Sequence, residues 1–356
     1  MKKPGEVFLG VDIGGTKVAA GLVSDSGRIL TRAREAMSAR GTAADGLAAV
    51  QAAITAALDG RSALGIGISS PGPLDPRRGL VLNPPNLPCW RNFPLARAVE
   101  KTHRVPVRLD NDANAAALAE ARWGAGRGFS AVFYATLGTG IGTGLILDGK
   151  IYHGRTGAAV EGGHLSLNPH GHRCGCGQRG CIEALAAGPA VARRARLAVR
   201  RDARAGAALL RLAHVARPPL AGATLPAEGL WPGVARRQRA PALAHGVSKL
   251  PRNAAAIRAE TVAEAWRAGD PLATAVLDET AALLARWLGA MVTLLEPEVI
   301  IFGGGMGRLM AHWFPVIRRQ MPAWTLNSRA AEIPLRRARY GAEAGIAGAA
   351  ALCLPS

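Results

Sequence analysis

Three cysteines and one histidine lie close together in the sequence, with the spacing His-x9-Cys-x-Cys-x4-Cys. Glycines fill most of the gaps between the cysteines, so the backbone can fold tightly around one point. Three thiolates and one imidazole suit a four-coordinate zinc site. Because the whole chain has only five cysteines, we predict a structural Zn²⁺ site rather than free thiols beside a core histidine. The predicted ligands are His164, Cys174, Cys176 and Cys181, with His170 and His172 as alternative nitrogen ligands.

Two carboxylates flank this segment: Glu161 precedes the histidine and Glu183 follows the last cysteine. A chain folded around a metal would bring these distant carboxylates near one another. Paired carboxylates suit neighbouring hydroxyl groups, because each can accept one or two O–H hydrogen bonds. The alternative, two solvated surface charges, fits poorly beside a metal site. We therefore expect the metal to position Glu161 and Glu183.

A third carboxylate stands at a predicted strand-to-helix corner. A strand over Val105–Leu109 leads into Asp110-Asn111-Asp112, and a helix is predicted over Ala115–Trp123. Asp112 therefore lies near a helix N-terminus, on a rigid corner where a carboxylate can act as a general base. Asp110 is the rival base, although it falls on the opposite side of an extended strand from Asn111. A simple helix cap is the alternative role for Asp112.

Glycine-rich segments follow three apolar strands, Val7–Ile13, Ala131–Leu137 and Val299–Phe302. After the first of them, a second strand is predicted over Val18–Val23 and a third over Arg28–Ala33. The segment after Ala131–Leu137 repeats the plan, with a turn over Gly138–Gly144 and a strand from Leu145, which suggests a duplicated domain. Neither a P-loop nor a G-x-G-x-x-G fingerprint is present, so a dinucleotide oxidoreductase is not expected.

Glycine turns let backbone N–H groups approach phosphate closely. Each of these turns alone fits an ordinary hairpin or helix entry. Three in one chain, with Asp12 and Lys17 on the first, favour nucleotide phosphates.

Composition indicates two domains in 356 residues, with 49% hydrophobic residues for the core. We see neither a signal-peptide pattern nor an apolar run long enough to span a bilayer, so a reduced, cytoplasmic protein without a membrane partner is expected. The net charge is +19, but thirteen arginines and one lysine against two carboxylates lie between Arg193 and Ala259. Because this excess is local, a nucleic-acid partner is not expected. The basic segment 198–259 is interpreted as a mobile surface insertion, with a shifted reading frame or an arm for an anionic partner as alternatives.

Together, the motifs resemble the ROK family of bacterial sugar kinases and sugar-responsive repressors. The matching residues are Asp12-Ile-Gly-Gly-Thr-Lys17, Asn111-Asp-Ala-Asn114, Glu161-x-x-His164 and Cys-x-Cys-Gly-x-x-Gly-Cys-x-Glu. The resemblance covers about Val7–Pro189 and Ala263–Ala351. It implies an α/β fold of the two-lobed, actin-like or hexokinase-like ATPase type, with RNase H-like lobes and a cleft between them. We expect residues 1–114 with about 338–356 in a small lobe and residues 115–337 in a large lobe.

The resemblance also implies a role for each motif. Asp12 would hold Mg²⁺ through water, and Asp112 would be the catalytic base. The residues implied for the ATP phosphates are Gly14, Gly15, Thr16, Lys17, Gly138, Thr139 and Gly140. Those implied for the adenosine are Gly303, Gly304 and Gly305. Those implied for the sugar are Gly72, Asn86, Asn111, Asp112, Glu161, His164 and Glu183.

The implied activity is that of an ATP-dependent hexose kinase, with glucokinase preferred. N-acetylglucosamine or N-acetylmannosamine kinase and fructokinase remain alternatives, because they share most of these motifs. A sugar-sensing repressor would need an N-terminal DNA-binding domain, and only about six residues precede the first predicted strand. We expect a homodimer or a higher homo-oligomer.

Overall fold

The computed structural model describes residues 6–215 and 254–354. Two five-stranded sheets in this part of the chain share one plan, with orders β3-β2-β1-β4-β7 and β10-β9-β8-β11-β12. In each sheet the first three strands are antiparallel and the last two join in parallel. The repeated topology agrees with the predicted duplication and gives two RNase H-like units.

The strands of the first sheet are β1 (Val7–Ile13), β2 (Lys17–Ser24), β3 (Ala33–Ala36), β4 (Ile66–Ser70) and β7 (Val107–Asn111). Those of the second are β8 (Ala131–Leu137), β9 (Ile141–Leu147), β10 (Lys150–Ile151), β11 (Val299–Gly303) and β12 (Leu335–Arg337). A short hairpin pairs β5 (Leu74–Asp75) with β6 (Leu80–Val81).

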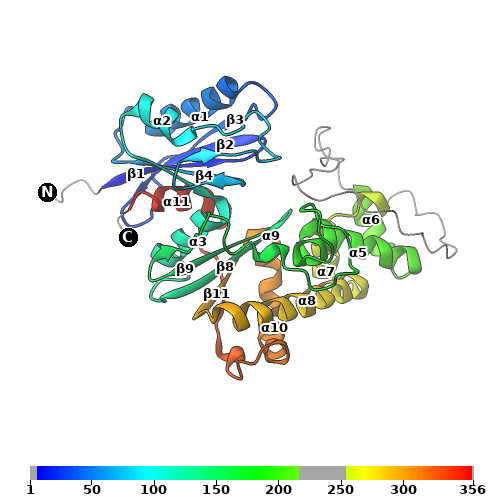
Figure 1. The fold of residues 1–356 in the computed structure, drawn as a ribbon. Helices are drawn as coiled ribbons and strands as arrows, with labels where there is room; N and C mark the ends of the chain where they lie inside the picture. The colour runs from blue at the N-terminus through cyan, green and yellow to red at the C-terminus, as the bar shows by residue number, and fades with distance from the viewer. Residues whose placement is uncertain (1–5, 216–253, 355–356) are drawn as a thin grey trace.

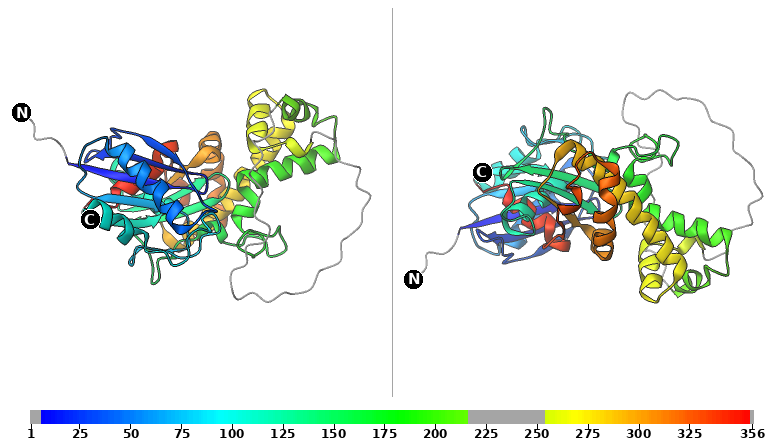
Figure 2. Two further views of the ribbon diagram at one scale, coloured as in Figure 1. Left: turned by 90° about the horizontal axis from the view of Figure 1, so that it is seen from above. Right: turned by 90° about the horizontal axis from the view of Figure 1, so that it is seen from below.

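Helices lie in layers around the two sheets (Figure 1). The outer face of the first sheet carries α1 (Ala43–Leu58) and α2 (Leu95–His103), while α3 (Asp112–Trp123) and α11 (Ala344–Ala351) lie between the sheets. The far face of the second sheet carries α8 (Pro271–Leu295) and α10 (Phe314–Gln320). To one side lie α5 (Gly188–Arg201), α6 (Ala207–Val215) and α7 (Ala259–Arg267), as Figure 2 shows. Two short helices complete the set, α4 (Ile182–Ala186) and α9 (Gly304–Met310).

Glycine allows α11 to lie directly on the first sheet. A Cβ atom on Gly67 would lie 1.7 Å from the carbonyl oxygen of Ala349, and one on Gly10 would lie 1.9 Å from that of Ile346. Any side chain at these strand positions would push the helix away. Since α11 also packs on α3, the C-terminal helix holds the strands that carry Asp12 and Asn111 against the start of α3.

Three strand predictions were wrong by two or more residues at a boundary. The strand predicted over Val105–Leu109 spans Val107–Asn111, because pairing with β4 extends to Asn111. The third strand begins at Ala33 rather than Arg28, because Leu22 N donates to the Thr31 side-chain oxygen at 2.9 Å instead of to a backbone partner. The second glycine turn ends at Gly140 rather than Gly144, and β9 starts at Ile141. Gly142 and Gly144 are strand residues against which Ala113 and Ala117 of α3 pack closely.

The basic segment predicted as an insertion is partly built into the core. Its first part completes α5 and forms α6, where Leu209 is fully buried, and Ala254 near its other end is also fully buried. The prediction of a surface insertion over 198–259 is therefore wrong at both ends, because these edges pack beside α7. The rest of the segment, residues 216–253, lies outside the described residues. No helix in the described ranges is long and apolar enough to cross a membrane.

Candidate active site

The parallel strands of the first sheet bring their polar ends to one edge. Strand pairing places Asp12 of β1 beside Ser69 of β4, and Ser70 beside Asn111 of β7. Carboxyl ends of parallel strands are where α/β sheets commonly bind ligands. We therefore centre the candidate site on this edge.

Asp12 stands at the entrance to the first glycine turn. The Ser69 hydroxyl, fully buried, donates to Asp12 Oδ1 at 2.9 Å. Burial raises the pKa of Asp12, while the Ser69 hydrogen bond and the nearby Lys17 charge lower it. The turn is tight, since Gly14 N donates to Lys17 O at 2.9 Å. One carboxylate beside a phosphate-type turn fits Mg²⁺, which binds through one or two carboxylates together with substrate phosphates.

Asp112 is the first residue of α3, one position after the helix cap. Asn111 Oδ1 accepts from Ala113 N at 2.9 Å, which fixes the corner and leaves the Asp112 side chain exposed to solvent. Although solvent reaches it, protein surrounds this side chain closely enough that desolvation raises its pKa to about 6. The negative charges of Asp12 and Glu161 raise the pKa further, against the lowering effect of the Ala113 N–H. The arrangement suits a general base that is ionised near neutral pH.

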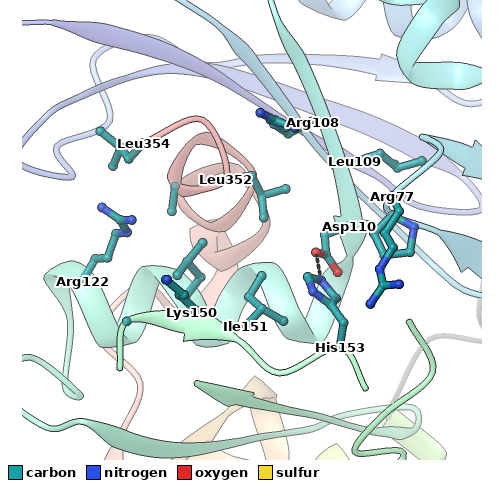
Figure 3. A pocket seen from close by; sticks show the side chains of 14 residues that line it. Arg77, Arg108, Leu109, Asp110, Arg122, Lys150, Ile151, His153, Leu352 and Leu354 are labelled. Carbon is teal, nitrogen blue, oxygen red and sulfur yellow. Dashed lines mark hydrogen bonds and ion pairs between the residues drawn. The ribbon is translucent and has the colours of Figure 1, made fainter. Parts of the chain in front are cut away.

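The rival carboxylate, Asp110, is fully occupied. It is 3% exposed, and its Oδ1 accepts from Asn111 N at 2.7 Å and from Asn114 Nδ2 at 3.0 Å. Its Oδ2 lies 2.6 Å from Nε2 of His153, which belongs to the segment just after β10 of the second sheet (Figure 3). Both oxygens are thus engaged away from Asp112, which supports Asp112 over Asp110 as the base. The Asp110–His153 pair escaped the sequence analysis, because nothing in the local pattern connects the two residues.

Glu161 is positioned by a short 3₁₀ turn, Gly162–His164. Gly162 N donates to Thr143 Oγ1 at 2.9 Å, and Trp287 Nε1 donates to Gly162 O at 3.0 Å. Burial raises the pKa of Glu161, the His164 charge lowers it and the Glu183 charge raises it. The predicted group of Glu161, His164 and Glu183 is therefore brought together. The sequence patterns did not identify Thr143 and Trp287 as residues that hold this turn. A threonine within an otherwise apolar strand was the local signal for Thr143.

Glu183 connects the metal segment to the second glycine turn. Ile141 N donates to its Oε2 at 3.0 Å, and a Cβ atom on Gly140 would lie only 2.5 Å from that oxygen. Its Oε1 accepts from Cys174 Sγ at 3.3 Å. This carboxylate therefore orders the turn expected to hold phosphate, in addition to its expected role toward the sugar.

Other predicted residues lie beside these groups. A Cβ atom on Gly72 would lie 3.7 Å from Asn111 Nδ2, and one on Gly15 would lie 3.0 Å from Asn86 O. The third glycine segment enters α9 rather than a hairpin, and Gly304 lies against Leu137 O at the end of β8. The second and third glycine segments are therefore neighbours, with open space at Gly138 and Gly305.

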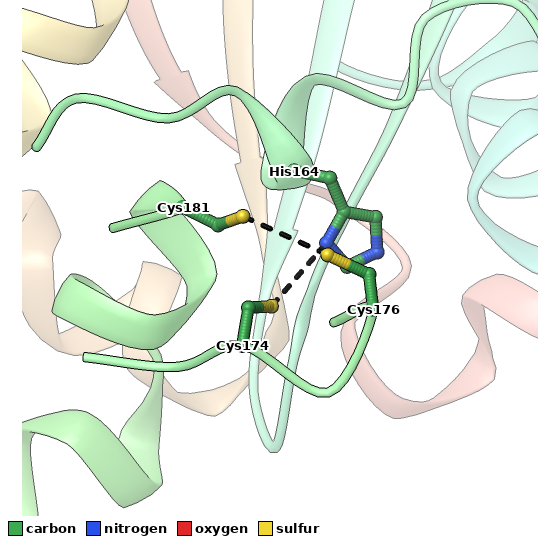
Figure 4. Close-up of side chains that lie close together, drawn as sticks. All are labelled: His164, Cys174, Cys176 and Cys181. Atoms are coloured by element: carbon green, nitrogen blue, oxygen red, sulfur yellow. Dashed lines mark hydrogen bonds between the residues drawn. The ribbon is translucent and has the colours of Figure 1, made fainter. Parts of the chain in front are cut away.

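The predicted metal ligands form one cluster. Single ligand atoms of His164, Cys174, Cys176 and Cys181 all lie within 4.8 Å of one another (Figure 4). Cys176 Sγ and Cys181 Sγ are 3.7 Å apart, and Cys174 Sγ and His164 Nδ1 are 3.5 Å apart. Tetrahedral zinc, with bonds of about 2.3 Å to sulfur and about 2.0 Å to nitrogen, separates two sulfurs by about 3.8 Å and sulfur from nitrogen by about 3.5 Å. His170 and His172 are not part of this cluster.

The backbone around the cluster requires glycine at Gly180. Its φ is +69°, and a Cβ atom there would lie 1.7 Å from Asn168 O. Burial raises the pKa of the Cys181 thiol to about 11 and also raises that of Cys174. Adjacent thiolates would therefore need a bound cation to form at neutral pH. The geometry and the donor set both fit a structural metal site.

Comparison with known proteins decides the family, because the ROK family profile matches residues 8–355. The chain belongs to the ROK family. A glucokinase of Thermotoga maritima is 32% identical to this ROK protein over 345 residues, which are 97% of this chain and 96% of that protein. An N-acetylmannosamine kinase of Yersinia pseudotuberculosis is 30% identical over 96% of each chain.

One similar solved structure contains bound ligands. The crystal structure of a ROK family glucokinase from Streptomyces griseus, in complex with glucose and AMPPNP, matches this ROK protein with a TM-score of 0.75. The two chains are 34% identical, and the match covers 97% of this chain and 98% of that one. The actin-like ATPase fold expected from the sequence is thereby confirmed.

Proposed function

We propose that this ROK protein is an ATP-dependent hexose kinase that phosphorylates the 6-hydroxyl of glucose. The observation that carries the proposal is the Asp112 corner: an accessible carboxylate with a pKa of about 6 at the N-terminus of α3, facing Asp12 and Glu161. Relatives that are glucokinases, one of them solved with glucose and AMPPNP, support this substrate pair.

Each group of residues has its own proposed role in phosphoryl transfer. Asp112 accepts the proton of the attacking hydroxyl, because a hexose hydroxyl is a poor nucleophile until its proton has an acceptor. Phosphoryl transfer otherwise requires positioning and neutralisation of charge. The turns Gly14–Lys17 and Gly138–Gly140 supply the neutralising dipoles through N–H groups other than those of Gly14 and Gly138, which donate within their own turns. Asp12 is the carboxylate that would hold Mg²⁺. The adenosine lies along Gly303–Gly305, in the open space at Gly305.

The sugar is held from two sides. Gly72, Asn86 and Asn111 contact it from the first sheet's loops, while Glu161, His164 and Glu183 contact it from the metal segment. Structural Zn²⁺ bound by His164 and the three cysteines would fix this second group. Since Glu183 also touches the second phosphate turn, one carboxylate links sugar and nucleotide positions. We assign residues 1–114 with about 338–356 and residues 115–337 to the two lobes that enclose this cleft.

The N-acetylmannosamine kinase relative makes that activity the second candidate. A coupled assay of ADP release across glucose, N-acetylglucosamine, N-acetylmannosamine, mannose and fructose distinguishes them. We expect glucose to have the highest kcat/KM. A preference for an N-acetylhexosamine would move the activity to the second candidate, and no turnover with any sugar would contradict a kinase.

A further inference from the structure

A cavity lies at the junction of the two sheets, and its lining does not include Asp112. Its volume is about 350 Å³. Strand β7, helix α3, the β9–β10 hairpin and the end of α11 contribute to its wall (Figure 3). That volume lies at the small end of the range of about 300–1,000 Å³ found for ligand pockets. It therefore fits a small organic molecule.

Four cationic side chains from four segments line this cavity: Arg77, Arg108, Arg122 and Lys150. The side chains of Arg108 and Lys150 are exposed, and in the described part of the chain neither side chain has a hydrogen-bond or ion-pair partner. Arg77 donates to Gly154 O at 3.3 Å, which ties it to the segment that follows β10. Cations collected in a concave site from separate segments raise the local concentration of anions.

The carboxylate in the lining, Asp110, is paired with His153 rather than with Arg108 or Lys150. Asp110 already accepts from Asn111 N, Asn114 Nδ2 and His153, so both oxygens have partners of their own. The remaining wall is largely apolar, with Ile151 and Leu352 among its members. A ligand that matches the wall therefore carries a concentrated negative charge on a compact apolar body.

We propose that this cavity is a second binding site, which takes a small organic phosphate monoester. Arginine and lysine supply charge-assisted hydrogen bonds to the phosphate oxygens, and the organic body lies on Ile151 and Leu352. The site contains Arg108 of the first sheet and Lys150 of the second. Arg108 is also on the strand that ends at Asn111, so the bound molecule contacts both halves of the protein close to the catalytic corner.

Phenyl phosphate is the probe for this site, and calorimetry on the full-length protein is the measurement. The titration is done at pH 8, where the phosphate is dianionic. A salt concentration of about 0.15 M suppresses non-specific attraction. Excess glucose and AMPPNP block the proposed catalytic site. Benzyl alcohol, which has the ring without the charge, is the ligand control.

The variants Arg108→Glu and Lys150→Glu should each weaken binding at least about tenfold, since each reverses a charge in the wall. Lys101→Glu, on the exposed side of α2, makes the same change of charge outside the cavity and should bind as wild type does. No binding of phenyl phosphate to the wild-type protein would overturn the proposal. An equal loss in Lys101→Glu would also overturn it, because it would reveal attraction to the net positive charge alone.

Discussion

Replacing the proposed base tests the active-site reasoning most directly. Asp112→Asn keeps the shape of the side chain, and its Oδ1 can still accept from Ala113 N, which Asp112 Oδ1 does at 2.8 Å. The variant loses the negative charge and with it the ability to take a proton. The corner should therefore stay folded, with glucose binding largely intact.

The expected loss of kcat is about 10²–10⁴-fold, which corresponds to about 3–5 kcal/mol of transition-state stabilisation. The pKa of about 6 adds a second expectation for the wild-type enzyme. Because the base must be ionised, kcat/KM should rise with pH through 6 and then level off. At pH 5 only about a tenth of the base is ionised, so kcat/KM should be about tenfold below its plateau.

The contribution of Asp112 to folding stability should depend on pH in the opposite sense to kcat/KM. The folded protein binds the Asp112 proton more tightly than the unfolded chain, whose pKa is near 3.8. Stability from this group is therefore present at low pH and is lost as pH rises between 3.8 and about 6. Asp112→Asn removes that loss, so it should raise the melting temperature at pH 7.5 and change it little at pH 4.

The assay is steady-state ADP release, with glucose affinity measured separately by calorimetry. Asp110→Asn is the matched control, because it makes the same change two residues earlier. The Oδ1 atom of that asparagine can still accept from Asn111 N and Asn114 Nδ2. It should keep kcat within a few-fold. If Asp112→Asn retains more than about a tenth of wild-type kcat, or if Asp110→Asn loses as much as Asp112→Asn, the assignment of the base is wrong.

Four further changes test other parts of the structure. Cys176→Ser should lower the melting temperature and glucose affinity together, because it removes a ligand of the proposed zinc; stoichiometric zinc by elemental analysis with unchanged affinity would contradict this. His153→Gln should lower the melting temperature with little effect on kcat, since buried Asp110 loses a charge-assisted partner; unchanged thermal unfolding would show that the pair contributes nothing. Deleting residues 203–255 should destabilise the fold by about 2–5 kcal/mol through loss of buried Leu209 alone, as measured by denaturant unfolding. A Gly/Ser linker of equal length in place of residues 217–252 should instead keep kinase activity within a few-fold. Equal effects of the two variants would contradict this difference. Glucose should reduce the radius of gyration in solution scattering and raise ATP affinity, because its proposed contacts come from both sides of the cleft; the absence of both effects would exclude closure.

Short-range patterns in the sequence were sufficient for much of the site. The metal cluster was predicted from spacing alone, because its three cysteines are close in sequence and glycine lets the chain turn around one point. The long helix α8 (Pro271–Leu295) also has local signals, namely a proline in its first turn and a long apolar period. The strands that carry the glycine turns were also correct, because buried parallel strands are continuous apolar runs.

Contacts between distant segments decided the rest. The sequence left Asp110 and Asp112 as rivals, and only the approach of His153 from the other sheet shows that Asp110 is already engaged. The contact of Glu183 with the turn at Gly140 depends on how the metal segment packs against β9. The start of β9 was misplaced because glycines are typical of turns. Here Gly142 and Gly144 instead leave room for α3 to pack on the strand. The raised pKa of Asp112 is likewise a tertiary property. Its causes are the protein packed around the side chain and the charges of two carboxylates from remote segments.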